Sequence, residues 1–380
     1  MHHPSKLSNT TASIFSIMGK MAVDHNAINL SQGFPGFNID PKLHALVTEA
    51  MQEGHNQYAP MQGIFSLREK IAEKLNVAYG SNYHPGKEIT ITTGATQAIY
   101  SAIATFVHPG DQVIVLKPAY DSYEPSIQTH GGVAVPIQLK GPDYRVNWEE
   151  IKRAISSKTR MLIINTPHNP TGSVLAESDM LQLQQLLEGT NIILLSDEVY
   201  EHIIFDGKQH QSVARFPKLA ERALIVASFG KSFHTTGWKM GYIAGPAAMM
   251  KEFHKVHQFN VFCVNHPMQK AFATYLETPA HYLDLGNFYQ QKRDLFLNLI
   301  KESRFHFAPT AGTYFQLLDY SAITDDRDTD FAERLVKNHG IASIPTSIFN
   351  IDEEDFKMLR FCFAKTDETL EKAAEILNAI

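Results

Sequence analysis

The sequence predicts an α/β protein whose main unit is a mostly parallel sheet covered by helices on both faces. Short runs dense in Val, Ile and Leu alternate with helix-like segments through the middle of the chain. Strands buried on both faces of a parallel sheet have this continuous apolar character. From about residue 282 the strands and helices follow another order. The length of 380 residues also exceeds what one compact core usually holds, so we expect two packed units.

Six apolar runs are the expected strands of the sheet. They are "EITITT" (88–93), "DQVIVL" (111–116), "GVAVPIQL" (132–139), "RMLIIN" (160–165), "NIILLS" (191–196) and "ALIVAS" (223–228). Between them, helical periodicity predicts helices over 97–107 and over 179–189, the second closed by Gly189.

The last hundred residues predict a smaller α+β unit. A long helix is expected over 282–303, followed by a strand in "AGTYFQLLDY" (311–320) and a helix near 328–339. A strand in "KMLRFCFA" (357–364) and a terminal helix from 367 complete this unit. Helices and strands mixed in this order are typical of α+β architecture.

Composition excludes several classes of function. The net charge is −6, from 34 basic and 40 acidic groups, which gives no support to nucleic-acid or membrane-surface binding. Cys263 and Cys362 are the only cysteines, which fits a reducing compartment and argues against a disulfide framework. The N-terminus has no signal-peptide core and no apolar run approaches membrane-spanning length. A cytoplasmic protein is therefore expected.

Polar and small residues follow the strands of the predicted sheet. In open parallel sheets, ligands bind outside the carboxyl ends of the strands. The residues expected at this edge are Gly94, Ala95 and Thr96, then Tyr120, Asn169, Asp197, Tyr200 and Lys231. Together they predict a binding site there.

Each of these motifs also has an ordinary structural explanation. Lys231 alone would be a solvated lysine, Asp197 a helix N-cap, and "NPTG" at 169–172 a β-turn. "GKS" at 230–232 is not a phosphate-binding loop, because Ile225 stands where that motif needs glycine. His254 and His257 form a tight pair, but two histidines on a polar helix are usually surface residues, so no metal site is expected. A functional site is favoured over these separate explanations because the segments occur together, in one particular order along the chain.

That order resembles the fold-type I pyridoxal-phosphate (PLP) aminotransferases over nearly the whole chain. The matching segments are "NLSQGFPGF" (29–37), "NQYAPMQG" (56–63), "TTGATQAI" (92–99), "KPAYDSYEP" (117–125), "NTPHNPTG" (165–172), "SDEVY" (196–200), "SFGKSFHTTGWKMGY" (228–242) and "LRFCFAK" (359–365). The chain is most similar to the kynurenine/methionine aminotransferase branch, and "HQFNVFCVNHPMQ" (257–269) favours its methionine-type members. The resemblance implies a large domain, 40–280, with a mostly parallel seven-stranded sheet. It implies a smaller α+β domain from 1–39 and 281–380.

The resemblance also implies catalytic roles. Lys231 would bond covalently to the PLP aldehyde and then act as the base at the substrate Cα, because a partly desolvated amine is a good nucleophile. Asp197 would pair with the pyridine nitrogen and keep it protonated. Tyr200 and Asn169 would hydrogen-bond the phenolic oxygen of the ring.

Further residues would hold the cofactor and the substrate. Gly94, Ala95, Thr96, Ser228 and Lys239 would bind the phosphate, Tyr120 would stack on the ring, and Tyr58 would reach the phosphate of a neighbouring subunit in a homodimer. Arg360 would bind the substrate α-carboxylate with help from Asn169 and Gly33, while Phe15 and Phe262 would form an apolar pocket. Lys239 departs from the arginine commoner in the broad family, and His234 has no functional explanation.

The implied reaction is ping-pong transamination between an L-amino acid and a 2-oxo acid, with methionine, aromatic amino acids or kynurenine as favoured donors. A second enzymatic hypothesis is a PLP-dependent β-lyase acting on cysteine S-conjugates on the same scaffold, which the motifs do not separate from transamination. A PLP-sensing module without turnover is a third hypothesis. It is disfavoured because fewer than thirty residues precede "NLSQGFPGF", too few for a DNA-binding domain.

Overall fold

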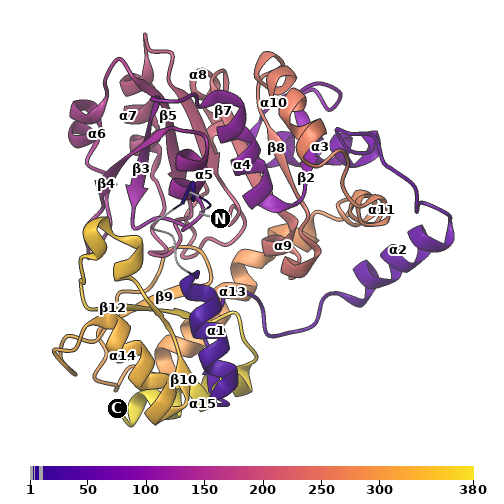
Figure 1. Cartoon of the computed structure of the whole chain (residues 1–380). Helices are drawn as coiled ribbons and strands as arrows, with labels where there is room; N and C mark the ends of the chain where they lie inside the picture. Colours follow the sequence, from indigo (N-terminus) through magenta and orange to yellow (C-terminus); the bar gives the residue numbers. More distant parts are fainter. Residues whose placement is uncertain (1–2, 4, 8–11) are drawn as a thin grey trace.

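The computed structural model describes residues 3, 5–7 and 12–380 and confirms the α/β class (Figure 1). Its strands are β1 (Ile28–Asn29), β2 (Ile89–Thr92), β3 (Gln112–Lys117), β4 (Val133–Gln138), β5 (Thr159–Asn165), β6 (Ile193–Asp197), β7 (Ala223–Ser228), β8 (Gly241–Ala244), β9 (Phe315–Asp319), β10 (Ile341–Ala342), β11 (Ile344–Pro345) and β12 (Met358–Cys362).

The α-helices lie between and after these strands. They are α1 (Ile14–Asp24), α2 (Pro41–Gln52), α3 (Phe65–Tyr79), α4 (Gly94–Phe106), α5 (Tyr123–Thr129), α6 (Trp148–Ala154), α7 (Glu177–Leu187), α8 (Pro217–Ala220), α9 (Phe229–Ser232), α10 (Ala247–Asn260), α11 (His266–Tyr275), α12 (Ala280–Leu283), α13 (Leu285–Leu299), α14 (Asp328–Arg334) and α15 (Asp367–Asn378). No helix in the described part of the chain is long and apolar enough to cross a membrane.

The central sheet has seven strands in the order β2-β8-β7-β6-β5-β3-β4. Strand β8 pairs antiparallel with both β2 and β7, and the pairs from β7 to β4 are parallel. The carboxyl ends of β5, β6 and β7 therefore meet at one edge, where Asn165 is in register with Asp197. This topology brings the predicted site residues together.

Alternating residues of the strands face two helical layers. Val113 and Val115 of β3 pack with α4, α5 and α10, whereas Ile114 and Leu116 pack with α6, α7 and α8. The side chains of a strand alternate between faces, so a strand buried on both sides must be apolar throughout. This explains why the runs of the inner strands β3, β5, β6 and β7 are rich in Val, Ile and Leu.

The C-terminal elements form a second, antiparallel sheet in the order β11-β12-β9. The N-terminal part of the chain joins them, because β1 pairs parallel with β10 through Ile28 and Ile341. Figure 1 shows α1, in indigo, lying among the yellow and orange C-terminal elements. At the opposite side of the molecule α2 packs against α11.

Two predictions of local structure need correction. Strand β8 completes the sheet but was not among the six runs, because four residues beginning with glycine carry too weak an apolar signal. The helix expected over 282–303 begins earlier and is divided into α12 and α13 at Asp284. At this break, a side chain on Gly286 would lie 2.9 Å from the Ile204 carbonyl, so close backbone packing shapes the start of α13.

Candidate active site

A cavity lies at the carboxyl edge of the central sheet and gathers most of the predicted site residues. Ten of them line it: Gly94, Ala95, Thr96, Tyr120, Asn169, Asp197, Tyr200, Ser228, Lys231 and Lys239. They come from separate segments of the chain, and only the parallel sheet brings those segments to one place.

Lys231 lies on α9, immediately after β7. Its Nζ donates hydrogen bonds to the Gly33 carbonyl at 3.0 Å and to the Tyr314 hydroxyl at 3.0 Å. The Tyr314 hydroxyl itself donates to the Gly33 carbonyl at 2.7 Å. Burial lowers the pKa of Lys231 to about 8, which increases the fraction of neutral, nucleophilic amine near neutral pH.

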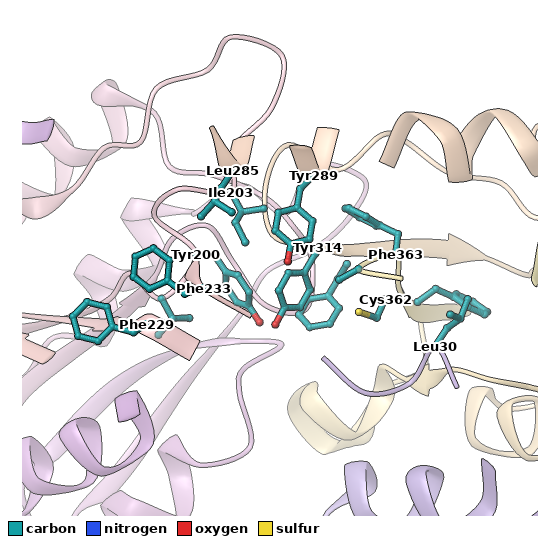
Figure 2. Close-up of a cluster of buried hydrophobic side chains, with 14 of the residues drawn as sticks. Leu30, Tyr200, Ile203, Phe229, Phe233, Leu285, Tyr289, Tyr314, Cys362 and Phe363 are labelled. Carbon is teal, nitrogen blue, oxygen red and sulfur yellow. The ribbon is translucent and has the colours of Figure 1, made fainter. Parts of the chain in front are cut away.

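Tyr314 is a site residue that the sequence did not identify. It lies within the predicted strand segment "AGTYFQLLDY", where an aromatic residue reads as ordinary core. Its ring packs edge-on against Tyr200, with ring centroids 5.2 Å apart. Figure 2 shows Tyr200 and Tyr314 side by side at the centre of a buried aromatic cluster.

Asp197 ends β6 and is 4% exposed. Its Oδ2 accepts a 2.6 Å hydrogen bond from the Tyr123 hydroxyl, and its Oδ1 accepts from the Val199 N–H at 3.3 Å. Burial raises the pKa of Asp197 to about 6 despite these bonds. A cationic group in the cavity would stabilise the carboxylate. Tyr123 was missed because nothing distinguishes it locally from Tyr120.

The N-terminus of α4 opens onto the same cavity. Gly94 has a φ of +71°, and a side chain there would point at Lys239, 3.6 Å from its Nζ. The Thr96 hydroxyl lies 3.4 Å from the Tyr120 hydroxyl. Gln97 Oε1 accepts a 2.9 Å hydrogen bond from the Thr93 N–H, just before the helix. A helix N-terminus beside an ammonium group is well suited to an anion.

Arg360 and Asn169 form a polar pair beside the cavity. Arg360 is 1% exposed, and it donates from Nη1 to Asn169 Oδ1 at 2.7 Å and from Nη2 to the Ser31 carbonyl at 2.9 Å. Its Nε is buried without a hydrogen-bond partner. The guanidinium carbon lies 3.8 Å from the Phe315 ring centroid and 5.2 Å from that of Phe15. A donor left over on a buried cation can receive a carboxylate.

Two predicted site residues lie away from this cavity. Tyr58 and Phe262 are 80% and 56% exposed, and their rings meet edge-on with centroids 5.1 Å apart. They remain predictions, because both are expected to act at a subunit interface or pocket mouth.

The histidines singled out in the sequence lie in hydrogen-bonded or aromatic surroundings. His254 Nε2 lies 2.7 Å from the Thr90 hydroxyl, and His257 Nδ1 lies 3.3 Å from Gln97 Nε2. Within the described residues, no cluster of three or more His, Cys, Asp or Glu could hold a metal. His234, at a φ of +57°, packs edge-on against Phe37, and burial lowers its pKa to about 4.

Comparison with known proteins identifies the family. Residues 25–377 match the model of aminotransferase class I and II. The chain belongs to this family. The methionine aminotransferase of Escherichia coli is 46% identical over 377 residues, covering 99% of this chain and 98% of that protein. A kynurenine–oxoglutarate transaminase of Dictyostelium discoideum is 32% identical, covering 98% of this chain and 95% of its own.

Solved structures agree. A structure from E. coli, described as having a methionine aminotransferase function, has a TM-score of 0.98 and 45% identity, with both chains fully covered. N-succinyldiaminopimelate aminotransferase from Mycobacterium tuberculosis has a TM-score of 0.96 and 34% identity, again over both whole chains. This aminotransferase therefore uses PLP and takes an amino acid and a 2-oxo acid as substrates. The relatives do not favour the β-lyase hypothesis or the sensing hypothesis.

The residues of the cavity fit PLP chemically. Lys231 offers an amine with a lowered pKa, and Asp197 offers a buried carboxylate that needs a cation. The α4 N-terminus and Lys239 offer donors and positive charge where Gly94 leaves room for a phosphate. An aldehyde, a protonatable ring nitrogen and a phosphate would each find a suitable partner.

Proposed function

We propose that this aminotransferase transfers the amino group of methionine, an aromatic amino acid or kynurenine to a 2-oxo acid. The proposed substrate class rests on the surroundings of Arg360. The guanidinium carbon lies 3.8 Å from the ring centroid of Phe315 and 5.2 Å from that of Phe15, and its Nε has no hydrogen-bond partner, so a carboxylate bound there would meet aromatic surroundings. The methionine aminotransferase and the kynurenine–oxoglutarate transaminase among its relatives support the same class.

The proposed roles of the cofactor-binding residues follow from their chemistry. Gly94, Ala95, Thr96, Ser228 and Lys239 hold the phosphate, and Tyr120 covers the ring. Asp197 holds a proton at the ring nitrogen, and its bond from Tyr123 keeps the carboxylate oriented. Tyr200 and Asn169 bond the phenolic oxygen. Arg360, with Asn169 and the backbone near Gly33, binds the α-carboxylate.

Lys231 has two tasks in this proposal. Bound PLP supplies an aldehyde that condenses with amines and a ring that withdraws electrons from the substrate Cα. Lys231 would hold PLP covalently through that aldehyde. Its amine, once free, would be the group that moves the proton from the substrate Cα. The Gly33 carbonyl and the Tyr314 hydroxyl, each 3.0 Å from Nζ, hold the amine within the site.

The proposal includes the assembly of the enzyme. Tyr58, highly exposed in one chain, completes the phosphate site of a neighbouring subunit in a homodimer. The exposed Phe262 beside it belongs to the mouth of the substrate pocket. The large domain of 40–280 and the small domain of 1–39 and 281–380 enclose the site, and the enzyme acts in the cytoplasm.

Two measurements test the proposed function. Lys231→Ala should abolish the visible absorbance that PLP acquires when bound to the lysine, and it should abolish turnover; full turnover in the variant would refute the assignment. A donor panel of methionine, phenylalanine, kynurenine, glutamine and aspartate tests the substrate class, read as bleaching of that absorbance. A strong preference for aspartate would contradict the apolar pocket.

A further inference from the structure

The turn after β6 has two chemically distinct faces. Asp197 and Tyr200 line the cavity, whereas the intervening Glu198 and the following Glu201 are buried on the side away from it. The Glu198 and Glu201 side chains are 1% and 4% exposed. Each of the two proposed site residues is therefore followed directly by a buried carboxylate: Glu198 follows Asp197, and Glu201 follows Tyr200.

Glu201 is bound by three groups from other elements. Its Oε1 lies 2.5 Å from the Lys74 ammonium of α3 and accepts from the Tyr242 hydroxyl of β8 at 3.3 Å. Its Oε2 accepts a 2.6 Å hydrogen bond from the Tyr79 hydroxyl. Burial by itself would raise the pKa of Glu201, but the Lys74 charge, His202 at 3.7 Å and the hydrogen bonds from Lys74 and Tyr79 lower it to about 2. The carboxylate is therefore ionised throughout the physiological range.

Glu198 is bound as completely, by a different set of groups. Its Oε1 accepts from the Ser196 hydroxyl at 2.8 Å and from the Val213 N–H at 3.1 Å. Its Oε2 lies 2.8 Å from His210 Nε2. Together the two carboxylates attach the turn to α3, β8 and the 210–213 segment.

Such an arrangement is a costly way to stabilise a protein. Taking a carboxylate and an ammonium out of water costs several kcal/mol per ion, and well-packed apolar residues often give equal or greater stability. What a buried, fully bonded charge pair does supply is a single defined position for the segment that carries it. The segment here is the one that carries Asp197 and Tyr200.

We propose that Glu201, held by Lys74, Tyr79 and Tyr242, is a positioning residue that sets the placement of Tyr200 and Asp197 in the PLP site. Glu198 and His210 also hold this turn. The proposal rests on the proposed roles of Asp197 and Tyr200, and none of these anchoring residues touches PLP or substrate.

The test separates positioning from folding stability. In the variant Lys74→Met/Tyr79→Phe/Glu201→Leu/Tyr242→Phe, apolar groups of similar volume replace Glu201 and the three groups bonded to it together, so that none of the three is left as a donor without its acceptor. The readouts are the Tm of the apoenzyme, its dissociation constant for PLP, and the pH at which the visible absorbance of bound PLP changes. Asp328→Asn is the control: this buried carboxylate accepts from the Ser347 N–H and hydroxyl, both at 2.7 Å, in the C-terminal unit.

The four-residue variant is expected to keep a Tm close to that of the wild type. It should bind PLP about tenfold more weakly and show a displaced absorbance titration, because small misplacements of site groups are costly. Asp328→Asn should lower the Tm and leave both PLP readouts unchanged. Wild-type PLP affinity and titration in the four-residue variant would overturn the proposal.

If the four-residue variant fails to fold, a single substitution still tests the proposal. Tyr79→Phe removes only the hydroxyl that donates to Glu201 Oε2, and should shift the absorbance titration in the same direction by a smaller amount. No shift would overturn the proposal. Failure of the proposed function itself is visible separately, because wild-type protein would then acquire no Lys231-dependent absorbance with PLP.

Discussion

Arg360 Nη1 donates a 2.7 Å hydrogen bond to Asn169 Oδ1, joining β12 of the C-terminal sheet to the loop that follows β5 of the central sheet. The two residues are 191 positions apart in the chain. Their contact places one guanidinium edge against the protein and leaves the buried Nε without a partner. The pair is thus set up to receive a planar anion at the boundary between the two sheets.

Replacing this guanidinium tests its role toward the carboxylate. Arg360→Lys keeps a positive charge but loses the planar fork. Hydrogen bonds to charged groups contribute about 1.5–3 kcal/mol, so KM for both the amino acid and the 2-oxo acid should rise by about 10- to 100-fold. Steady-state kinetics with each substrate varied checks this, measured at saturating PLP because Arg360 is also bonded to the proposed PLP contact Asn169. An unaltered KM for both substrates would contradict the assignment.

The reactivity of Lys231 should follow the proton on its amine. Burial lowers its pKa to about 8, and only the neutral amine attacks an aldehyde. The rate constant for PLP capture by the apoenzyme should therefore rise with pH up to about 8 and then level off. Stopped-flow absorbance at several pH values measures it. Tyr314→Phe removes an acceptor from the ammonium, so its midpoint should lie at lower pH; an identical profile would argue against that contact.

The buried Asp197 carboxyl should make the stability of the apoenzyme depend on pH. Its pKa is about 6 in the folded protein against an ordinary value of 3.8. Between these values the folded state binds more protons than the unfolded state, so the free energy of unfolding falls as pH rises from about 4 to about 6. The loss reaches about 3 kcal/mol, from 1.36 kcal/mol per pKa unit. Denaturant unfolding of apoenzyme over this range should show the loss in the wild type, and Asp197→Asn should lack it.

A mixture of two variant chains, each defective in PLP binding, tests whether Tyr58 acts across a subunit interface. Tyr58→Ala removes the phosphate contact, and Lys231→Ala removes the lysine. In a mixed dimer, one site would hold an intact Lys231 from the first chain and an intact Tyr58 from the second. Refolding the two variants together should restore wild-type PLP affinity in that one site. Mixing Tyr58→Ala with the Tyr58→Ala/Lys231→Ala chain should restore nothing. If Tyr58 acts within its own chain, neither mixture recovers.

The amino-acid sequence by itself determined the strands of the central sheet and the order of the proposed site residues. The inner strands β3, β5, β6 and β7 were visible as apolar runs because strands covered on both faces are mostly apolar along their length. Lys231 and Asp197 could be located because each lies at the end of such a run. Ten predicted residues meet in one cavity because neighbouring parallel strands end at one edge.

Only the tertiary structure decided which groups hold these residues in place. The bond from Lys231 to the Gly33 carbonyl spans 198 positions, and the bond from Lys231 to Tyr314 spans 83. The ion pair between Lys74 and Glu201 spans 127. Local patterns of hydrophobicity indicate which face of an element is buried. They do not indicate which polar group of another element will bond to a residue on that face. Those partners are set by how the helices and the second sheet pack on the first.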